Sequence, residues 1–110
     1  MSVDQESFVF LLMERLNDPK LTVRVHAGLQ LEGLGIEAKP ALPALLQLQQ
    51  SDDVHNRRLA AVVLGSLGSD LAEAVPPLVN ALQDEDQTVR RLAAENLEKI
   101  TSARGHRKAA

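Results

Sequence analysis

The sequence contains no cysteine, tryptophan or tyrosine, and its only aromatic residues are Phe8 and Phe10. The missing cysteines exclude disulfide bonds, thiolate catalysis and thiolate metal ligands. A core without large aromatic rings must be built from leucine, valine and alanine, which favours closely packed helices. Hydrophobic residues make up 45% of the 110 residues, which is typical of one ordinary globular domain.

Long apolar runs are also missing. The longest, from Phe8 to Met13, is far too short to cross a bilayer, and the opening residues MSVDQES lack the basic region of a signal peptide. We therefore expect a cytoplasmic protein with no membrane contact. Residues 1–100 hold all 15 acidic side chains and 9 of the 12 basic ones, a net charge of −6, and an acidic body argues against nucleic-acid binding.

A period of 33 residues organises the chain, because Arg24, Arg57 and Arg90 are equally spaced. The segments that begin at these arginines are RVHAGLQLEGL, RRLAAVVLGSL and RRLAAENLEKI. Small and apolar residues recur at matching places in the three segments: Ala27, Ala60 and Ala93, then Leu31, Leu64 and Leu97. Self-similarity at a period of this length indicates a stacked repeat array.

Each copy contains two helical patterns separated by a polar turn. Upstream of the arginine, apolar residues follow the i, i+3, i+4 spacing of an amphipathic helix, as in Val9, Leu12 and Met13. This pattern predicts a first helix, helix A, at about residues 5–16, 41–50 and 74–83. A second helix, helix B, is predicted at about residues 22–34, 55–67 and 88–102. Gly35 and Gly68 stand where a left-handed residue often ends a helix.

The segments NDPKLTVRVHAGLQL and DEDQTVRRLAAENL resemble HEAT repeats, in particular the short kind also called phycobilisome-lyase-like. The resemblance implies an all-α fold, a right-handed α-solenoid (alpha-alpha superhelix) of three helical hairpins. The repeats would cover about residues 8–40, 41–73 and 74–101, within a single domain of residues 1–101. Residues 102–110 are expected to be a flexible basic tail.

The resemblance also implies a ladder of turn aspartates and helix-B arginines between the repeats. Carried over to this sequence, it pairs Asp18 with Arg24 and Asp84 with Arg90. The middle copy departs from the pattern, because Ser51 holds the aspartate position. Asp52 and Asp53 are close enough in sequence to serve Arg57. An aspartate near a helix N-terminus can accept backbone N–H bonds and pair with a guanidinium, so we expect a structural role for these residues.

No group of residues in the sequence suggests catalysis, a metal or a cofactor. His26, His55 and His106 are not at the i, i+3 or i+4 spacing of paired ligands. His26 aligns with Leu59 and Leu92 and is expected to take the place of a packing leucine. The serines lie in no nucleophile motif, and the paired carboxylates lie in turns, where helix capping explains them. We therefore predict a protein that is not an enzyme.

Two surfaces are candidates for binding another protein. The first is the face of the B helices turned away from the A helices, the concave side of a HEAT stack. There the pattern predicts a shallow apolar patch with charged neighbours: Val25, Leu29 and Val62, with Arg58, Arg91 and Glu95. The alternative is that the helical phase is one residue off and the apolar members of this set belong to the core.

The second candidate surface is the first A helix, which is apolar on every side over SFVFLLM. Phe8, Phe10 and Leu11 would be exposed unless something covers them. The cover is expected to be a partner protein or a second copy of the chain, giving a homodimer. The alternative is that residues 1–7 fold back over this helix.

These observations predict a non-catalytic protein–protein interaction module, a scaffold or adaptor. Stacked repeats mainly present extended surfaces to partners. The alternative function, which follows the phycobilisome-lyase-like resemblance, is the handling of a bilin chromophore or of a phycobiliprotein that carries one.

Overall fold

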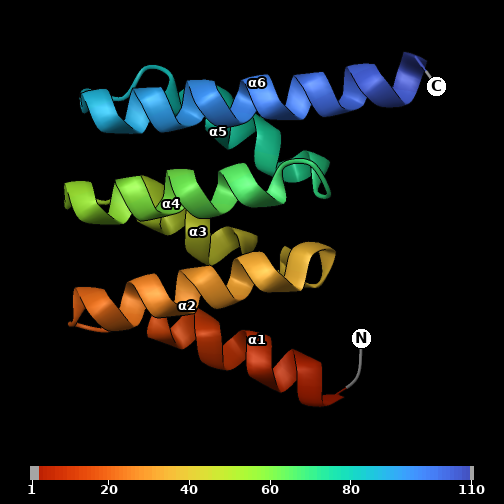
Figure 1. The fold of residues 1–110 in the computed structure, drawn as a ribbon. Coiled ribbons are helices and arrows are strands. Elements are labelled where there is room, and N and C mark those ends of the chain that lie inside the picture. The colour runs from red at the N-terminus through yellow and green to blue at the C-terminus, as the bar shows by residue number, and fades with distance from the viewer. Residues whose placement is uncertain (1–2, 110) are drawn as a thin grey trace.

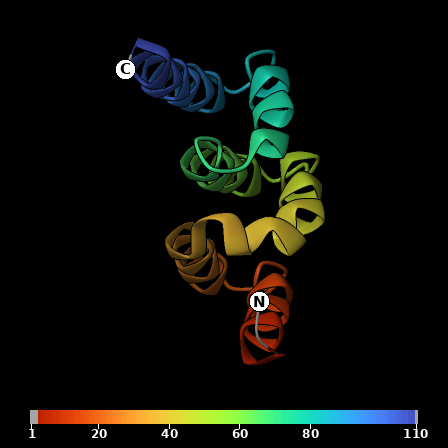
Figure 2. The same ribbon diagram turned by 90° about the vertical axis from the view of Figure 1, so that its right-hand side faces the viewer.

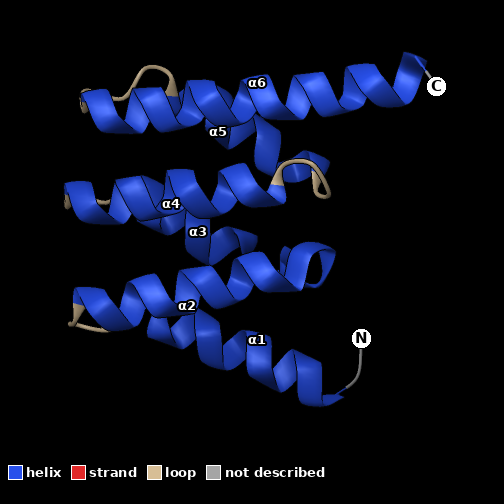
Figure 3. Ribbon diagram, in the orientation of Figure 1, coloured by secondary structure: helices blue, strands red, loops and turns tan. Residues whose placement is uncertain are grey.

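The computed structural model describes the backbone of residues 3–109 and the side chains of residues 4–103. This part of the chain is helical, with short connecting loops and turns (Figure 3). The six α-helices and two short 3-10 segments are α1 (Val3–Arg15), α2 (Leu21–Leu34), η1 (Gly35–Ala41), α3 (Leu42–Gln49), α4 (Val54–Leu67), η2 (Ala72–Ala74), α5 (Val75–Ala81) and α6 (Gln87–Ala109).

The helices form three stacked hairpins, as the 33-residue period predicted. Helices α1, α3 and α5 form one layer, and α2, α4 and α6 form the other (Figures 1 and 2). The N-terminal ends of α2, α4 and α6 lie on the same side of the stack (Figure 1). The first and last helices lie at opposite ends of the stack. Each repeat therefore packs mainly on its neighbours, as in an α-solenoid.

Prolines mark the beginnings of the two later A helices. Pro43 is the second residue of α3, and Pro76 and Pro77 follow the first residue of α5. Proline fits a first turn because the backbone N–H that it lacks would have no helical acceptor there. The predicted A helices are thus confirmed, although α3 and α5 are shorter than the sequence pattern indicated.

The core is made of leucine, valine and alanine from all three hairpins. Its largest fully buried side chains are Leu12, Leu16, Leu31, Leu45, Leu64, Leu67, Leu78, Val9, Val63 and Val89. The predicted A-helix stripe is buried only along part of its width, because Leu46 and Val79 are exposed on the outer side of α3 and α5.

The expected helix end near residue 102 is wrong, because α6 continues to Ala109. In the last copy Thr101 stands where Gly68 ends the preceding B helix, so no glycine favours a change of backbone direction there. The segment predicted to be a tail is therefore helical as far as it is described. The side chains from residue 104 onwards lie outside the described residues.

The two glycines that follow B helices have different roles. Gly35 has a φ of 57°, in the region that favours glycine, as predicted for a helix end. Gly68 has a φ of −62° and is right-handed, so the prediction of a left-handed cap is wrong there. A Cβ atom at Gly68 would collide with Cδ1 of Ile100, so this glycine is explained by the close approach of α6.

Candidate functional site

One arginine in the second hairpin joins its own turn to the turn of the third. Arg57 Nη1 donates hydrogen bonds to the carbonyl oxygens of Ser51 and Asp52, both at 3.0 Å. Its Nε donates to Oδ2 of Asp84 at 3.0 Å. The side chains of Arg57 and Asp84 are each 12% exposed, so solvent screens this ion pair only weakly. Arg57 therefore ties the second hairpin to the third.

The other two arginines make the same contact with their own turns. Arg24 Nη1 donates to the carbonyl oxygen of Asp18 at 2.7 Å, and Arg90 Nη1 donates to that of Asp84 at 2.7 Å. The carboxylate near Arg24 is Asp53 of the next hairpin, 3.6 Å from Nη2. Each arginine thus binds main-chain carbonyls in its own hairpin and, where a following hairpin exists, a carboxylate of that hairpin.

The expected ladder of aspartates and arginines between the hairpins is present, but the side-chain pairs assigned to it within one hairpin are wrong. These were Asp18 with Arg24, Asp84 with Arg90, and Asp52 or Asp53 with Arg57. The side chains of Asp18, Ser51 and Asp84 instead each accept a hydrogen bond from the backbone N–H two residues further on. The donors are Lys20 N to Asp18 Oδ1 at 2.8 Å, Asp53 N to Ser51 Oγ at 3.1 Å, and Asp86 N to Asp84 Oδ1 at 2.8 Å. Two aspartate carboxylates and one serine hydroxyl thus close their own turns.

A second arginine also crosses from the second hairpin to the third. Arg58 Nε and Nη2 donate to the two carboxylate oxygens of Asp86, at 3.0 and 2.9 Å. Asp86 Oδ2 also accepts a hydrogen bond from Val89 N at the start of α6. The hydrogen bond from Arg58 is the main reason that the pKa of Asp86 falls to about 2. Arg58 therefore helps to hold the stack in addition to its place at the groove described next.

An apolar groove lies between α2 and α4 on the side of the B helices. It has a volume of about 250 Å³ and is lined by Leu21, Val25, Leu29, His55, Arg58, Leu59 and Val62. We call this the α2–α4 groove. Val25 and Leu29 are 37% and 51% exposed, and together with Leu21 they follow the i, i+4, i+8 spacing along one side of α2. A second hollow of about 360 Å³ lies on the other side of the same three residues.

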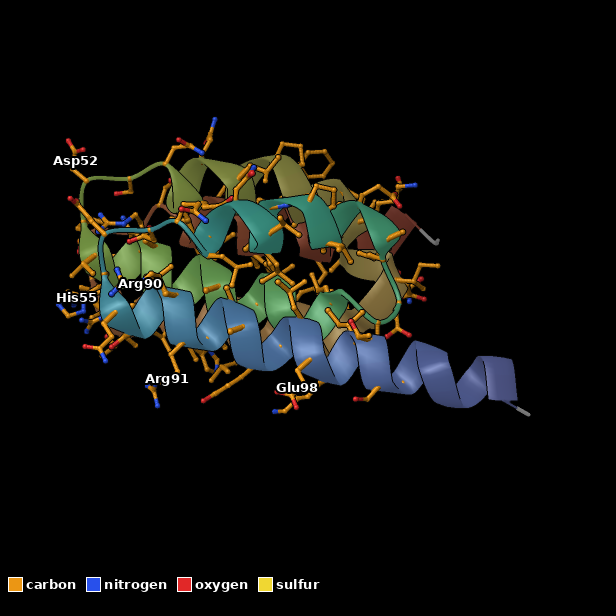
Figure 4. The ribbon with its side chains drawn as sticks, turned by 90° about the horizontal axis from the view of Figure 1, so that it is seen from above. Asp52, His55, Arg90, Arg91 and Glu98 are labelled. Carbon is orange, nitrogen blue, oxygen red and sulfur yellow. The ribbon has the colours of Figure 1, made fainter. Side chains whose placement is uncertain are left out.

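Four of the six residues predicted for the helix-B patch line the α2–α4 groove, and the other two lie elsewhere. Val25, Leu29, Arg58 and Val62 line the α2–α4 groove. Arg91 and Glu95 on α6 are exposed and are not among the lining residues. Figure 4 shows Arg91 projecting from α6 away from the layer of A helices, whereas Arg90 lies toward the turn before α6.

Three small residues beside the predicted patch, Gly28, Ala61 and Gly65, are buried. Gly28 lies so close to α4 that an added Cβ would be 2.9 Å from Leu59 Cδ1, and an added Cβ at Gly65 would collide with the side chain of Asn96. These residues allow the B helices to approach closely, so the exposed strip is narrower than the sequence predicted.

His26 is exposed, so its predicted role as a replacement for a packing leucine is wrong. The aligned residue Leu59 is buried between α2 and α4. His26 holds the same position in the first hairpin, where no hairpin precedes it. Instead, it lines a hollow of about 400 Å³ with Arg15, Thr22 and Val23.

The structure divides the apolar residues of the first helix between two sides. Phe10 and Met13 line a hollow that also includes Pro43 and Ala44 of α3. Phe8 and Leu11 are exposed on a different side of α1, away from this hollow. The proposed cover by residues 1–7 is wrong for residues 3–7, because they are part of α1 itself, and residues 1–2 lie outside the described residues.

The described side chains form no group of three or more His, Asp or Glu residues that could hold a metal ion. Within the same part of the chain, no helix has both the length and the apolar character needed to cross a membrane. Asp18, Asp53 and Asp84 accept hydrogen bonds from backbone N–H groups of their own turns, and Asp84 also accepts one from Arg57, so these carboxylates make structural contacts.

A family model for HEAT repeats matches residues 9–98. The chain belongs to the HEAT repeat family. HEAT repeats commonly act as protein-interaction scaffolds and are generally non-catalytic. The comparison with curated proteins finds no match. The HEAT fold explains the period and the hairpins, and the α2–α4 groove is a feature of this chain's own side chains.

Sequence reasoning missed three lining residues of the α2–α4 groove and two partners in the arginine contacts, Asp86 of Arg58 and Glu85 of Arg57. Leu21, His55 and Leu59 line the groove. Leu21 could have been found from its spacing, because it lies four residues before Val25 on the same helix side. Asp86 could have been found from the period, because it lies 33 residues after Asp53, which the sequence had already indicated as an arginine partner.

Proposed function

We propose that this HEAT repeat protein is a non-catalytic interaction module whose α2–α4 groove receives an amphipathic helix of another protein. The observation that carries the proposal is the exposed apolar strip of Val25 and Leu29 beside the half-buried Val62. Contiguous apolar surface of this kind is a common feature of protein-binding sites. Two neighbouring helices that flank an apolar groove accommodate a third helix.

The charged groups near the groove are paired within the chain, so its apolar side chains define the partner. His55 lies near the end of the groove where α2 and α4 both begin (Figure 1), and Arg58 follows one turn later on α4. The N-cap of α4 is Asp53, whose carboxylate accepts a hydrogen bond from His55 N, so the start of α4 already carries an acidic residue. A complementary helix would carry apolar residues at the i, i+3 or i+4 spacing that pack on Val25 and Leu29.

The bilin-handling alternative has no specific support in the described residues. Protein binding is favoured because the lining of the groove is almost wholly apolar and lies between two helices. The nearby cationic side chain Arg58 already holds Asp86 and is therefore not free to bind a propionate group.

Site-specific photo-crosslinking tests the proposal. A photoreactive amino acid is placed at Val25 in the groove or, as a matched control, at Leu46 on α3, because these two side chains are 37% and 40% exposed. We expect a specific protein adduct from position 25 that position 46 does not give. Leu29→Glu should weaken binding of the identified protein by about tenfold or more, because it places a charge in the apolar strip. Equal adducts from both positions would contradict the proposal.

A further inference from the structure

One side of α1 is exposed at the end of the stack. Its residues are Asp4, Phe8, Leu11 and Arg15, which we call the α1 end stripe. All four are exposed, and their spacing of four, three and four residues places them on one side of the helix. Figures 1 and 2 show no other element beyond α1 at this end.

The repeat period shows what the stripe would contact in the interior of a stack. The residues equivalent to Phe8 are Ala41 and Ala74, and both are fully buried. Pro77, which is equivalent to Leu11, is also buried, and its carbonyl oxygen accepts a hydrogen bond from Gln49 of the preceding hairpin. The α1 end stripe therefore lies where the later hairpins contact the hairpin before them, but with larger apolar residues.

We propose that the α1 end stripe pairs with the same stripe of a second copy, with the two α1 helices antiparallel. A two-fold axis that crosses the stripe between positions 9 and 10 brings Phe8 opposite Leu11 of the other copy. The same axis brings Asp4 opposite Arg15 of the other copy. The stripe is thus complementary to itself in both apolar contacts and charge, as a two-fold interface requires.

A head-to-tail arrangement of copies is disfavoured by the residues at the opposite end. Glu98 on α6 is exposed and is equivalent to Gly65, whose lack of a side chain allows close contact with the next hairpin. Lys20 is equivalent to Asp53 and Asp86, the carboxylates that receive arginines from the preceding hairpin. Stacking α6 of one copy on α1 of the next would thus insert a glutamate between helices and put Lys20 near arginine.

Charge reversal tests the antiparallel register. Asp4→Arg places two arginines opposite each other at both ends of the pair, and Arg15→Asp places two aspartates there. We expect each single variant to weaken dimerisation by about tenfold or more. An equimolar mixture of the two variants should form a heterodimer, because its pairs are again of opposite charge. The double variant Asp4→Arg/Arg15→Asp should recover self-association for the same reason.

The measurement is sedimentation equilibrium of the full chain between about 1 μM and about 1 mM, the range in which small interfaces dissociate. Phe10→Glu is the matched control, because Phe10 is exposed on the other side of α1 and this variant should remain a dimer. Circular dichroism confirms that each variant is folded.

Four results would overturn the proposal. The first three are a wild-type chain that is monomeric throughout this range, a dimer that neither charge reversal weakens, and single variants that fail to pair when mixed. The fourth is loss of the dimer in Phe10→Glu, which would place the contact on the other side of α1. None of these results affects the α2–α4 groove, which lies on different residues.

Discussion

Replacing Ser51 with aspartate should stabilise the stack, because Arg24 lacks a contact that Arg57 has. Arg57 Nε donates to Asp84 at 3.0 Å, whereas Arg24 Nε is buried without a hydrogen-bond partner. Ser51 is 27 residues after Arg24, as Asp84 is after Arg57. A carboxylate at position 51 would therefore lie beside Arg24 Nε.

The size of the effect follows from the hydrogen bond that the new carboxylate forms and from the repulsion that it meets. A hydrogen bond between charged groups contributes about 1.5–3 kcal/mol to stability. Ser51 Oγ accepts hydrogen bonds from Asp53 N and Asn56 Nδ2, and a carboxylate can accept both. Repulsion from the exposed Asp52 and Asp53 removes a few tenths of a kcal/mol each. We expect a net gain of about 1 kcal/mol, which raises the Tm by about 4 °C.

The assay is urea unfolding monitored by circular dichroism, with Ser51→Asn as the control that keeps the turn acceptor but adds no charge. The gain should fall to near zero when Arg24 is replaced by leucine, since the new carboxylate then has no guanidinium to bind. A gain of the same size in the Arg24→Leu background would show that the carboxylate does not act through Arg24. No change in the Arg24 background would equally rule out the proposed contact.

Two further predictions concern the same contacts. Arg57→Ala should lower the free energy of unfolding by about 2–3 kcal/mol, because Asp84 Oδ2 and the carbonyl oxygens of Ser51 and Asp52 lose the hydrogen bonds that Arg57 donates. Urea unfolding would measure this loss, and a change below about 0.5 kcal/mol would contradict it. Asp86→Asn should lower stability most above pH 4 and progressively less toward pH 2. The folded pKa of about 2 lies below the ordinary value of 3.8, so the contribution of Asp86 is complete above the ordinary value and is lost as pH falls through the folded one. A difference between wild type and variant that does not change with pH would contradict this explanation.

The hairpin architecture could be predicted because it depends on periodicity alone. The 33-residue period and the apolar spacing define three pairs of helices without knowledge of any particular contact. Helix ends depend on contacts across the stack, and these were predicted less well. Gly68 was predicted to be a left-handed residue at a helix end, but a glycine is needed there because of the nearby side chain of Ile100, which is 32 residues away in sequence.

The arginine partners could not be predicted from the alignment of the repeats. The alignment places an arginine and a turn aspartate in the same copy, and it cannot distinguish a contact within one hairpin from a contact with the next. The structure shows that the Asp84 carboxylate does both, because Oδ1 closes its own turn and Oδ2 accepts from Arg57. Only the three-dimensional stacking brings Arg57 and Asp84 together.

The candidate groove was predicted in part. Val25 and Leu29 were expected on an exposed side of the B helices, with the core as the alternative, and a phase error of one residue separates the two. The exposure of both side chains decides for the surface. Val25 and Leu29 are exposed while Gly28 between them is buried, because α4 approaches α2 closely at Gly28. Helical periodicity alone does not predict how close two helices come.

Hydrogen–deuterium exchange of the chain with its crosslinked partner tests the proposed groove most directly. We expect binding to slow exchange in peptides covering residues 21–29 and 55–62, which line the α2–α4 groove. We expect no change in residues 42–49 of α3, on the other layer of the stack. Protection confined to α3 or to α5, with none in α2 and α4, would contradict the assignment of the groove as the binding site.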